Sequence, residues 1–235
     1  RLDYDMMVTG MAVAKHEFLP GSGVKVAYVD PANVVYSYTE DPHFKDCFYW
    51  GEIKTVPIAE LMKIDPTLTN DDLDKIAKAI GFEYPQLLQS MYIFKQPKIG
   101  GEVVCHQDST FLITEPESTV GFWFALEDAN KENGCLQVAS GGHKGPLRKL
   151  FKRDNNKMEM IELSNEPFPE TDTFVEVKKG SLVLLHGRLP HYSCENKSSK
   201  SRHAYTLHVI EGKSKYLDYN WLQRKNLKTG GFVDV

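Results

Sequence analysis

The sequence predicts a mainly β protein with flanking α-helices, built as an antiparallel sandwich or a jelly-roll barrel. Three observations lead to this class. Short apolar, β-prone segments follow one another after residue 88, with turn residues between them. The one clear helical periodicity lies before that point. The 235 residues, 41% hydrophobic and 26% charged, have the size and composition of a globular protein that buries a core without disulfide support.

We expect the whole chain, 1–235, to form a single domain. Its length corresponds to one large domain or two small ones, and neither a repeat nor a low-complexity segment divides it. The expected parts are a helical and irregular N-terminal part at 1–88, a barrel core at 89–223 and a C-terminal tail at 224–235. Because the chain begins at Arg1 rather than Met, we expect the native N-terminus, with any targeting segment, to be missing.

Net charge and cysteine content limit which partners and which cellular compartment we expect. A net charge of −4 excludes a strongly basic nucleic-acid binder, so no nucleic acid is expected as a partner. No apolar run approaches the roughly 20 residues of a membrane-spanning helix, so no membrane is expected either. Four cysteines without a CxxC pair favour free thiols in a reducing compartment, and we expect a cytoplasmic protein. The oligomeric state stays open.

One helix is predicted in the N-terminal part. Thr69 or Asn70 can cap its start, acidic residues occupy its first turn, and Gly81 ends it. A shorter helix is predicted near 58–64 and a strand at 24–29. The apolar residues that recur at helical spacing are Leu73, Ile76, Ala77 and Ile80.

The predicted barrel strands are apolar segments bounded by glycine, proline or asparagine. They lie at 90–94, 120–126, 136–139, 173–177, 181–185 and 204–210. The stretch 141–168 shows no clear strand and is predicted to be a long insertion, of the kind that often forms a lid over a site.

His106-Gln107-Asp108 is the first chemical signal. Residues i and i+2 of a strand project from the same face, so the imidazole and the carboxylate can bind one cation from one side. Alone the triplet is a weak signal, because a surface histidine and aspartate on an ordinary strand give the same pattern.

A third ligand is expected from a distant strand. The segment 180–191 has the pattern of a buried strand, a turn and then His191. With the first pair, this histidine would complete a facial set of two histidines and one carboxylate, which holds Fe(II) and leaves positions for substrate and O₂. His186 competes for the role. We prefer His191, because it lies just beyond the turn, and expect His186 to hydrogen-bond locally or pack in the core.

Arg202 is the third signal. It lies in a segment, 201–207, that alternates like a half-buried strand. A guanidinium inside a barrel needs a carboxylate, which it can bind through two parallel hydrogen bonds. A diacid bound to iron through its 2-oxo acid end would present one. The alternative is an exposed arginine in a solvated cluster with Lys197 and Lys200.

Taken in order, these motifs resemble the phytanoyl-CoA dioxygenase family. The match is strong over about 85–140 and 178–223 and weaker over 17–50. The segments that carry it are His106-Gln107-Asp108, Glu132-Asn133-Gly134-Cys135-Leu136, Gly142-His143, 180–191, Arg202 and Asn220-Trp221-Leu222-Gln223.

The resemblance implies a double-stranded β-helix (jelly-roll, cupin-like) barrel and Fe(II)/2-oxoglutarate chemistry. By motif position it implies three iron ligands, which are His106, Asp108 and His191. It also implies that Arg202 forms a salt bridge with 2-oxoglutarate.

Three further residues match family positions that contact the cosubstrate. They are Met91, Trp123 and, after a one-residue shift of the alignment, Lys25. From the residues alone, Trp123 shares a strand face with the small Gly121 and Ala125, which leaves room for a ligand against the indole. A tryptophan that fills a gap in the core is the alternative.

The predicted function is an Fe(II)- and 2-oxoglutarate-dependent dioxygenase that uses O₂ to hydroxylate a C–H bond of a small molecule, with succinate and CO₂ as coproducts. The resemblance favours an acyl-CoA or another anionic metabolite. The basic stretch at 144–153 could attract such a substrate, although a charge run is usually a solvated surface. His143, His203 and His208 are expected to be structural.

Two alternatives remain open. The first is a catalytically silent sensor module that keeps the barrel and binds iron or a diacid. The second is a zinc or manganese hydrolase or isomerase with the same three ligands. Arg202 and Trp123 argue against the second, because hydrolysis needs no diacid pocket.

Overall fold

The computed structural model describes residues 13–19, 23–31, 34–36, 50–52, 69–154, 157–223 and 230–231. It divides the chain into two compact units, Arg1–Val56 and Pro57–Val235. The single domain over 1–235 stays a prediction. None of the helices within the described ranges is long and apolar enough to cross a membrane.

The described part of the N-terminal unit is mainly strand, so the expectation of a helical and irregular segment is wrong for these residues. β1 (Val13–Leu19) pairs antiparallel with β2 (Gly23–Val29), and β3 (Val34–Tyr36) pairs with β4 (Trp50–Glu52). β2 confirms the strand predicted at 24–29. The other three strands were not predicted. The short helix predicted near 58–64 lies outside the described residues.

The helix α3 (Asn70–Ala79) confirms the predicted helix. Thr69 caps it, because its hydroxyl accepts the Asp72 N–H at 3.1 Å and the Asp72 carboxylate accepts the Thr69 N–H at 3.1 Å. Gly81 follows the last turn with φ 106°, a left-handed conformation that glycine adopts without steric strain.

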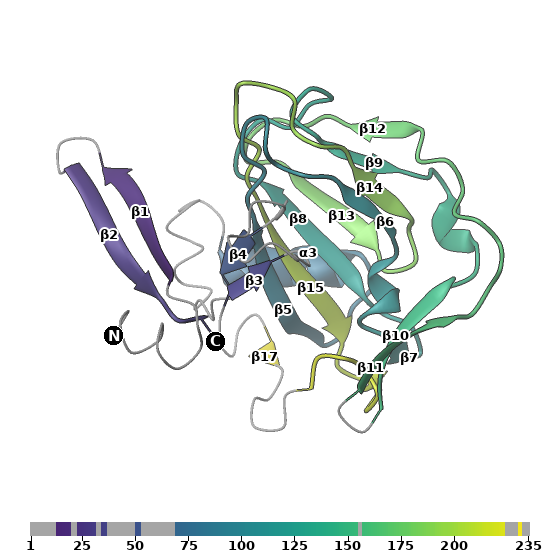
Figure 1. Ribbon diagram of the computed structural model, residues 1–235. Coiled ribbons are helices and arrows are strands. Elements are labelled where there is room, and N and C mark those ends of the chain that lie inside the picture. The colour runs from purple at the N-terminus through teal and green to yellow at the C-terminus, as the bar shows by residue number, and fades with distance from the viewer. Residues whose placement is uncertain are drawn as a thin grey trace. The chain divides into compact units, whose positions relative to one another are not determined.

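The described residues of the C-terminal unit form two main antiparallel sheets and two short two-stranded ones (Figure 1). The larger sheet has the order β13 (Leu182–His186), β8 (Val120–Ala125), β15 (Ala204–Glu211), β5 (Pro85–Ile93) and β17 (Gly230–Gly231). The smaller sheet has the order β12 (Thr173–Val175), β9 (Leu136–Val138), β14 (His191–Ser193) and β6 (Val103–His106). From β5 to β9 and from β12 to β15, consecutive main strands alternate between the sheets. This is the predicted double-stranded β-helix.

The predicted strands after residue 88 are confirmed to within a few residues, but the expectation of no strand at 141–168 is wrong. β10 (Lys149–Asp154) and β11 (Lys157–Glu162) form an antiparallel hairpin there. Leu150 and Phe151 are adjacent in β10, and Ile161 directly follows Met160 in β11, so neither strand keeps the apolar alternation that identifies a half-buried strand. Other short elements are η2 (Asp108–Thr110), η3 (Gly142–Lys144), β7 (Thr114–Glu115) and β16 (Lys215–Tyr216).

The two faces of the larger sheet pack into different cores. Residues directly opposite each other in an antiparallel pair lie on the same face. Phe122 lies opposite Leu207, and both pack with α3 on the outer face. Trp123 lies opposite Thr206 on the inner face. That face packs against apolar residues of the smaller sheet and its connections, so polar side chains that point inward are shielded from water.

Truncating Leu207 tests this packing. We expect Leu207→Ala to lower the free energy of unfolding by about 2–5 kcal/mol, because this 3% exposed side chain leaves a cavity beside α3. Urea denaturation measures the loss. Leu163→Ala removes the same atoms from a side chain that is 51% exposed, and its effect should stay within about 0.5 kcal/mol. Equal losses in the two variants would contradict this packing.

Candidate metal centre and diacid pocket

Three side chains meet between the two sheets. Nε2 of His106 and Nε2 of His191 each lie 3.6 Å from Oδ1 of Asp108. The candidate ligand atoms of all three lie within 4.8 Å of one another. The two histidines come together because His191 pairs directly with His106 across β14 and β6. The structure therefore brings together the three residues predicted as metal ligands.

The strand predicted through His106-Gln107-Asp108 is shorter than expected. β6 ends at His106, and Asp108 begins the 3₁₀ turn η2. Gln107 keeps an extended backbone, with φ −122° and ψ 133°, so the side chains on either side of it still project to one side. The Thr110 N–H closes this turn by donating to the Gln107 carbonyl at 3.0 Å, and the Ser109 N–H joins it to the Gly187 carbonyl at 2.8 Å.

Both imidazoles are oriented by backbone carbonyls. Nδ1 of His106 lies 2.8 Å from the Val104 oxygen, and Nδ1 of His191 lies 2.9 Å from the Leu189 oxygen. A carbonyl oxygen can only accept a hydrogen bond, so each Nδ1 carries a proton and Nε2 is the nitrogen that faces Asp108 and can bind a metal. Burial, followed by the neighbouring His191, lowers the pKa of His106 and favours its neutral form.

Asp108 is buried among histidines. Burial alone would raise its pKa, but His208, His191 and His106 together outweigh it and hold the pKa well below its usual value. The carboxylate is therefore ionised. Two imidazole nitrogens and one carboxylate oxygen on one side of a buried space are a donor set that fits Fe(II).

His208 is a residue of this site that sequence reasoning assigned only a structural role. Its Nε2 lies 3.4 Å from Oδ2 of Asp108. It lies opposite Gly121, where a Cβ would come within 3.0 Å of the same oxygen. The small residue that was expected to leave room for a ligand thus leaves room for Asp108. The signal was available, because His208 shares the strand alternation of Arg202.

Gln107 ties together the segments that carry the candidate ligands. Its Nε2 donates to the carbonyls of Pro146 at 3.1 Å and Arg188 at 2.8 Å, and its Oε1 accepts the Arg148 N–H at 3.0 Å. One fully buried amide therefore links the end of β6 to the chain before β10 and to the turn before His191.

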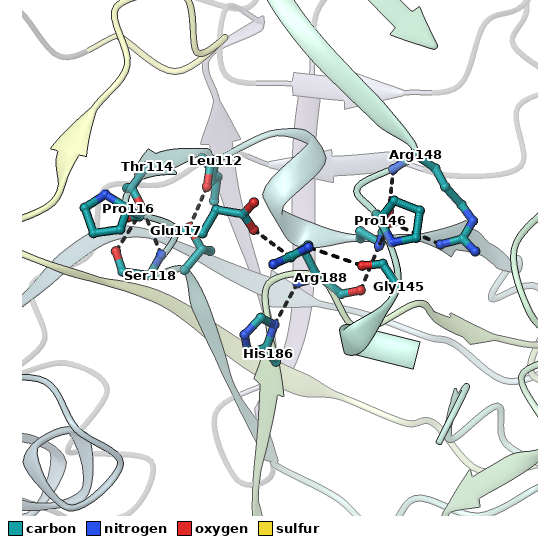
Figure 2. Close-up of polar contacts among 12 residues, drawn as sticks. Leu112, Thr114, Pro116, Glu117, Ser118, Gly145, Pro146, Arg148, His186 and Arg188 are labelled. Carbon is teal, nitrogen blue, oxygen red and sulfur yellow. Dashed lines mark hydrogen bonds and ion pairs between the residues drawn. The ribbon is translucent and has the colours of Figure 1, made fainter. Parts of the chain in front are cut away.

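Arg188 makes three further polar contacts at the same turn (Figure 2). Nε of Arg188 lies 2.9 Å from Oε2 of Glu117, and its Nη1 donates to the Gly145 carbonyl at 3.3 Å. The Arg188 N–H donates to Nδ1 of His186 at 3.1 Å. His186 is exposed, as expected of a locally bonded side chain, and lies outside the set of three.

A second site lies on the inner face of the larger sheet. Arg202 is 1% exposed, so the alternative of a solvated arginine is wrong. Its Nε donates to the Gly134 carbonyl at 3.1 Å and its Nη2 to Ser193 Oγ at 3.4 Å. Nη1 is buried without a partner among the described residues, and so is Nε1 of Trp123. The guanidinium carbon lies 5.4 Å from the centroid of the Trp123 ring.

Two buried donors without acceptors are unfavourable unless a ligand supplies the acceptors. Burial lowers the pKa of Arg202 to about 10, so the guanidinium stays charged at neutral pH. No described carboxylate forms an ion pair with it. The residues therefore fit a carboxylate ligand in this pocket, which we call the diacid pocket, lined by Arg202, Trp123 and Ser193.

Met91 and Lys25, the two remaining predicted site residues, lie in different units of the chain. Met91 lies opposite Thr206, which in turn lies opposite Trp123, so these three share the inner face. The Met91 side chain is exposed. Lys25 lies in β2 of the N-terminal unit, and its side chain lies outside the described residues.

Known proteins resemble this chain in sequence and fold. The family model described as Phytanoyl-CoA dioxygenase (PhyH) matches residues 33–204. A phytanoyl-CoA dioxygenase of Arabidopsis thaliana is 47% identical over 153 residues, which cover 65% of this chain and 54% of the plant protein. The chain thus spans about half the length of this relative.

Two more matches cover most of the chain. The phytanoyl-CoA dioxygenase domain-containing protein 1 homolog of Caenorhabditis elegans is 37% identical over 231 residues, 82% of this chain and 80% of that protein. The crystal structure of EvdO2 from Micromonospora carbonacea var. aurantiaca, complexed with 2-oxoglutarate, aligns with a TM-score of 0.53 and 19% identity. That alignment covers 94% of this chain and 84% of the other, and it supports the fold.

Removing the partner of Asp108 tests the metal centre. We expect His208→Leu to weaken Mn(II) binding by about 10- to 100-fold. Losing a residue that hydrogen-bonds to a metal ligand typically lowers the affinity of the site for the metal by this factor. Isothermal titration calorimetry with Mn(II) measures the change. His203→Leu makes the same substitution on the opposite face of the chain and should bind like the wild type. Wild-type affinity in His208→Leu would contradict the role of His208.

Proposed function

This chain belongs to the phytanoyl-CoA dioxygenase family, and we propose that it is an Fe(II)- and 2-oxoglutarate-dependent dioxygenase that hydroxylates a C–H bond of a small molecule. The observation that carries the proposal is the presence of two complementary sites between the two sheets. Two imidazole nitrogens and a carboxylate can hold the metal, and Arg202 with its unpaired Nη1 can hold a remote carboxylate.

Each residue then has a distinct role. His106, Asp108 and His191 would hold Fe(II) through Nε2, a carboxylate oxygen and Nε2. Arg202 Nη1 and Trp123 Nε1 would donate to the far carboxylate of 2-oxoglutarate. When bound, Fe(II) and 2-oxoglutarate supply the oxidising chemistry, in which 2-oxoglutarate and O₂ yield succinate, CO₂ and a hydroxylated substrate. The protein orients both groups and excludes water from them.

Met91 would line the cosubstrate pocket from β5, because it shares the inner face with Trp123. A zinc hydrolase would use the same three ligands but would leave the buried donors of the diacid pocket without an acceptor. A silent sensor module would use every residue named here, and only an oxidised product separates it from an oxygenase.

Apolar side chains of the β10–β11 hairpin favour a substrate that has an apolar part. Phe151 lies opposite Met160, so the two share one face of the hairpin. The Phe151 ring lies 5.7 Å from that of Phe111, which lies 6.2 Å from the His106 ring. Met160 is exposed on this face, so apolar side chains extend from a candidate metal ligand to the surface. An acyl-CoA or another anionic metabolite with an aliphatic part fits such a surface.

The charge of the basic stretch at 144–153, which runs into β10, is partly neutralised. Lys149 pairs with Glu162 at 2.9 Å, and the buried Arg148 lies 3.9 Å from the exposed Glu166. Its positive charge therefore supports an anionic substrate less strongly than the sequence implies.

Turnover of 2-oxoglutarate tests the proposed chemistry. We expect the wild-type protein to form succinate from 2-oxoglutarate with Fe(II) and O₂ but not with Zn(II). Asp108→Ala should abolish this activity, because it removes the charged ligand. Mass spectrometry of succinate measures it. Asp172→Ala, at an exposed position, is the matched control. Succinate formation by Asp108→Ala at the wild-type rate would contradict the ligand assignment.

The hairpin face is tested with the substrate itself. A panel of acyl-CoA compounds and other anionic metabolites, screened with Fe(II), 2-oxoglutarate and O₂, is searched by mass for a hydroxylated product. We expect Phe151→Ala to lower kcat/KM for that compound by about tenfold and to leave succinate formation without substrate unchanged. Phe174→Ala, on exposed β12, should change neither. Wild-type kcat/KM in Phe151→Ala would place the substrate elsewhere.

A further inference from the structure

Lys95 is a buried cation to which the proposed function assigns no role. Its side chain is 2% exposed. Nζ donates to Ser193 Oγ at 2.7 Å, to the Ser193 carbonyl at 3.3 Å and to the Cys194 carbonyl. These bonds use all three donors of the ammonium, but no described carboxylate pairs with its charge. A buried charge without a counter-ion is strongly unfavourable in an isolated protein.

A second buried cation lies beside the first. Arg202 donates from Nη2 to the same Ser193 Oγ, at 3.4 Å. Burial, followed by the charge of Arg202, lowers the pKa of Lys95 to about 7, and an anion bound nearby would favour the charged ammonium at neutral pH. Two cations that share one neutral hydroxyl repel each other. An anion bound next to them would offset both this repulsion and the unfavourable free energy of burying the two charges.

The backbone also joins the two cations. The Lys95 carbonyl accepts the Arg202 N–H at 2.9 Å. A Cβ on Gly134 would lie 2.9 Å from Cδ and 3.2 Å from Nζ of Lys95, and the Gly134 carbonyl accepts Nε of Arg202. The absence of a side chain at Gly134, whose φ is +78°, thus leaves space for the lysine, while its carbonyl holds the arginine.

Ser193 Oγ connects the two cations to the diacid pocket, because both of them donate hydrogen bonds to it. A hydroxyl oxygen has two acceptor positions and one proton. Lys95 and Arg202 donate to the two acceptor positions, so only the O–H remains free to interact, and it has no described acceptor. It joins Arg202 Nη1 and Trp123 Nε1 as a donor available to a ligand.

We propose that Lys95 is a positioning residue of the diacid pocket, which holds Ser193 as a donor to the remote carboxylate and supplies a second buried positive charge. This inference rests on the proposed function, because it assigns the anion to 2-oxoglutarate. It makes Lys95 a determinant of selectivity for a dianionic over a monoanionic 2-oxo acid. Lys95 itself need not touch the ligand, because its effect passes through Ser193 and through its charge.

The test compares two ligands that differ only in the remote carboxylate. 2-Oxovalerate has the carbon chain and the 2-oxo acid of 2-oxoglutarate but ends in a methyl group. Calorimetry on the full chain loaded with Mn(II) gives the Kd of each. We expect Lys95→Met to raise the Kd of 2-oxoglutarate by about tenfold, equivalent to about 1.4 kcal/mol, and to leave that of 2-oxovalerate unchanged.

The controls separate positioning from structural damage. Lys75→Met removes the same charge from an exposed helix position and should change neither Kd. Lys95→Gln keeps a donor for Ser193, removes the charge and should reduce the preference for 2-oxoglutarate as well, so the result does not depend on one variant folding. An equal rise in both Kd values, or an unchanged preference in both Lys95 variants, would overturn the inference alone. Wild-type protein that binds neither ligand would overturn the proposed function and this inference with it.

Discussion

The pairing of β14 with β6 is the interaction on which the candidate site depends. It places His191 directly opposite His106, although the two are far apart in the chain. The carbonyls of Leu189 and Val104 then fix both rings with Nε2 toward Asp108. Backbone hydrogen bonds therefore set both the distance between these groups and the orientation of the rings, and a metal would need little reorganisation of its ligands.

Burial gives the two halves of the site opposite electrostatic character. Around Asp108, histidines stabilise a single negative charge that would balance part of the charge of a divalent metal. Around Ser193, two cations lie in a buried environment without a described anion. A dianion that chelates the metal at one end and meets the cations at the other would satisfy both. The double-stranded β-helix makes this possible, because the inner face of one sheet reaches both halves.

The sequence predicted the elements in which burial of one face makes apolar residues recur with a regular period. The barrel strands and the amphipathic helix α3 are elements of this kind. The β10–β11 hairpin was not recognised, because adjacent apolar residues break the alternation in both of its strands. Ligand motifs are recognisable because residue type follows chemistry. His208 and Lys95 were missed because neighbours on other strands, Asp108 and Ser193, give each of them its place.

The central claim is that one metal ion and one diacid occupy a continuous site between the sheets. An anomalous difference map at the iron edge, from crystals grown without oxygen in Fe(II) and 2-oxoglutarate, tests it most directly. The account predicts a single peak bonded to His106, Asp108 and His191, with the far carboxylate of the diacid against Arg202. A peak bonded to other side chains, or a diacid that lies away from Arg202, would contradict it.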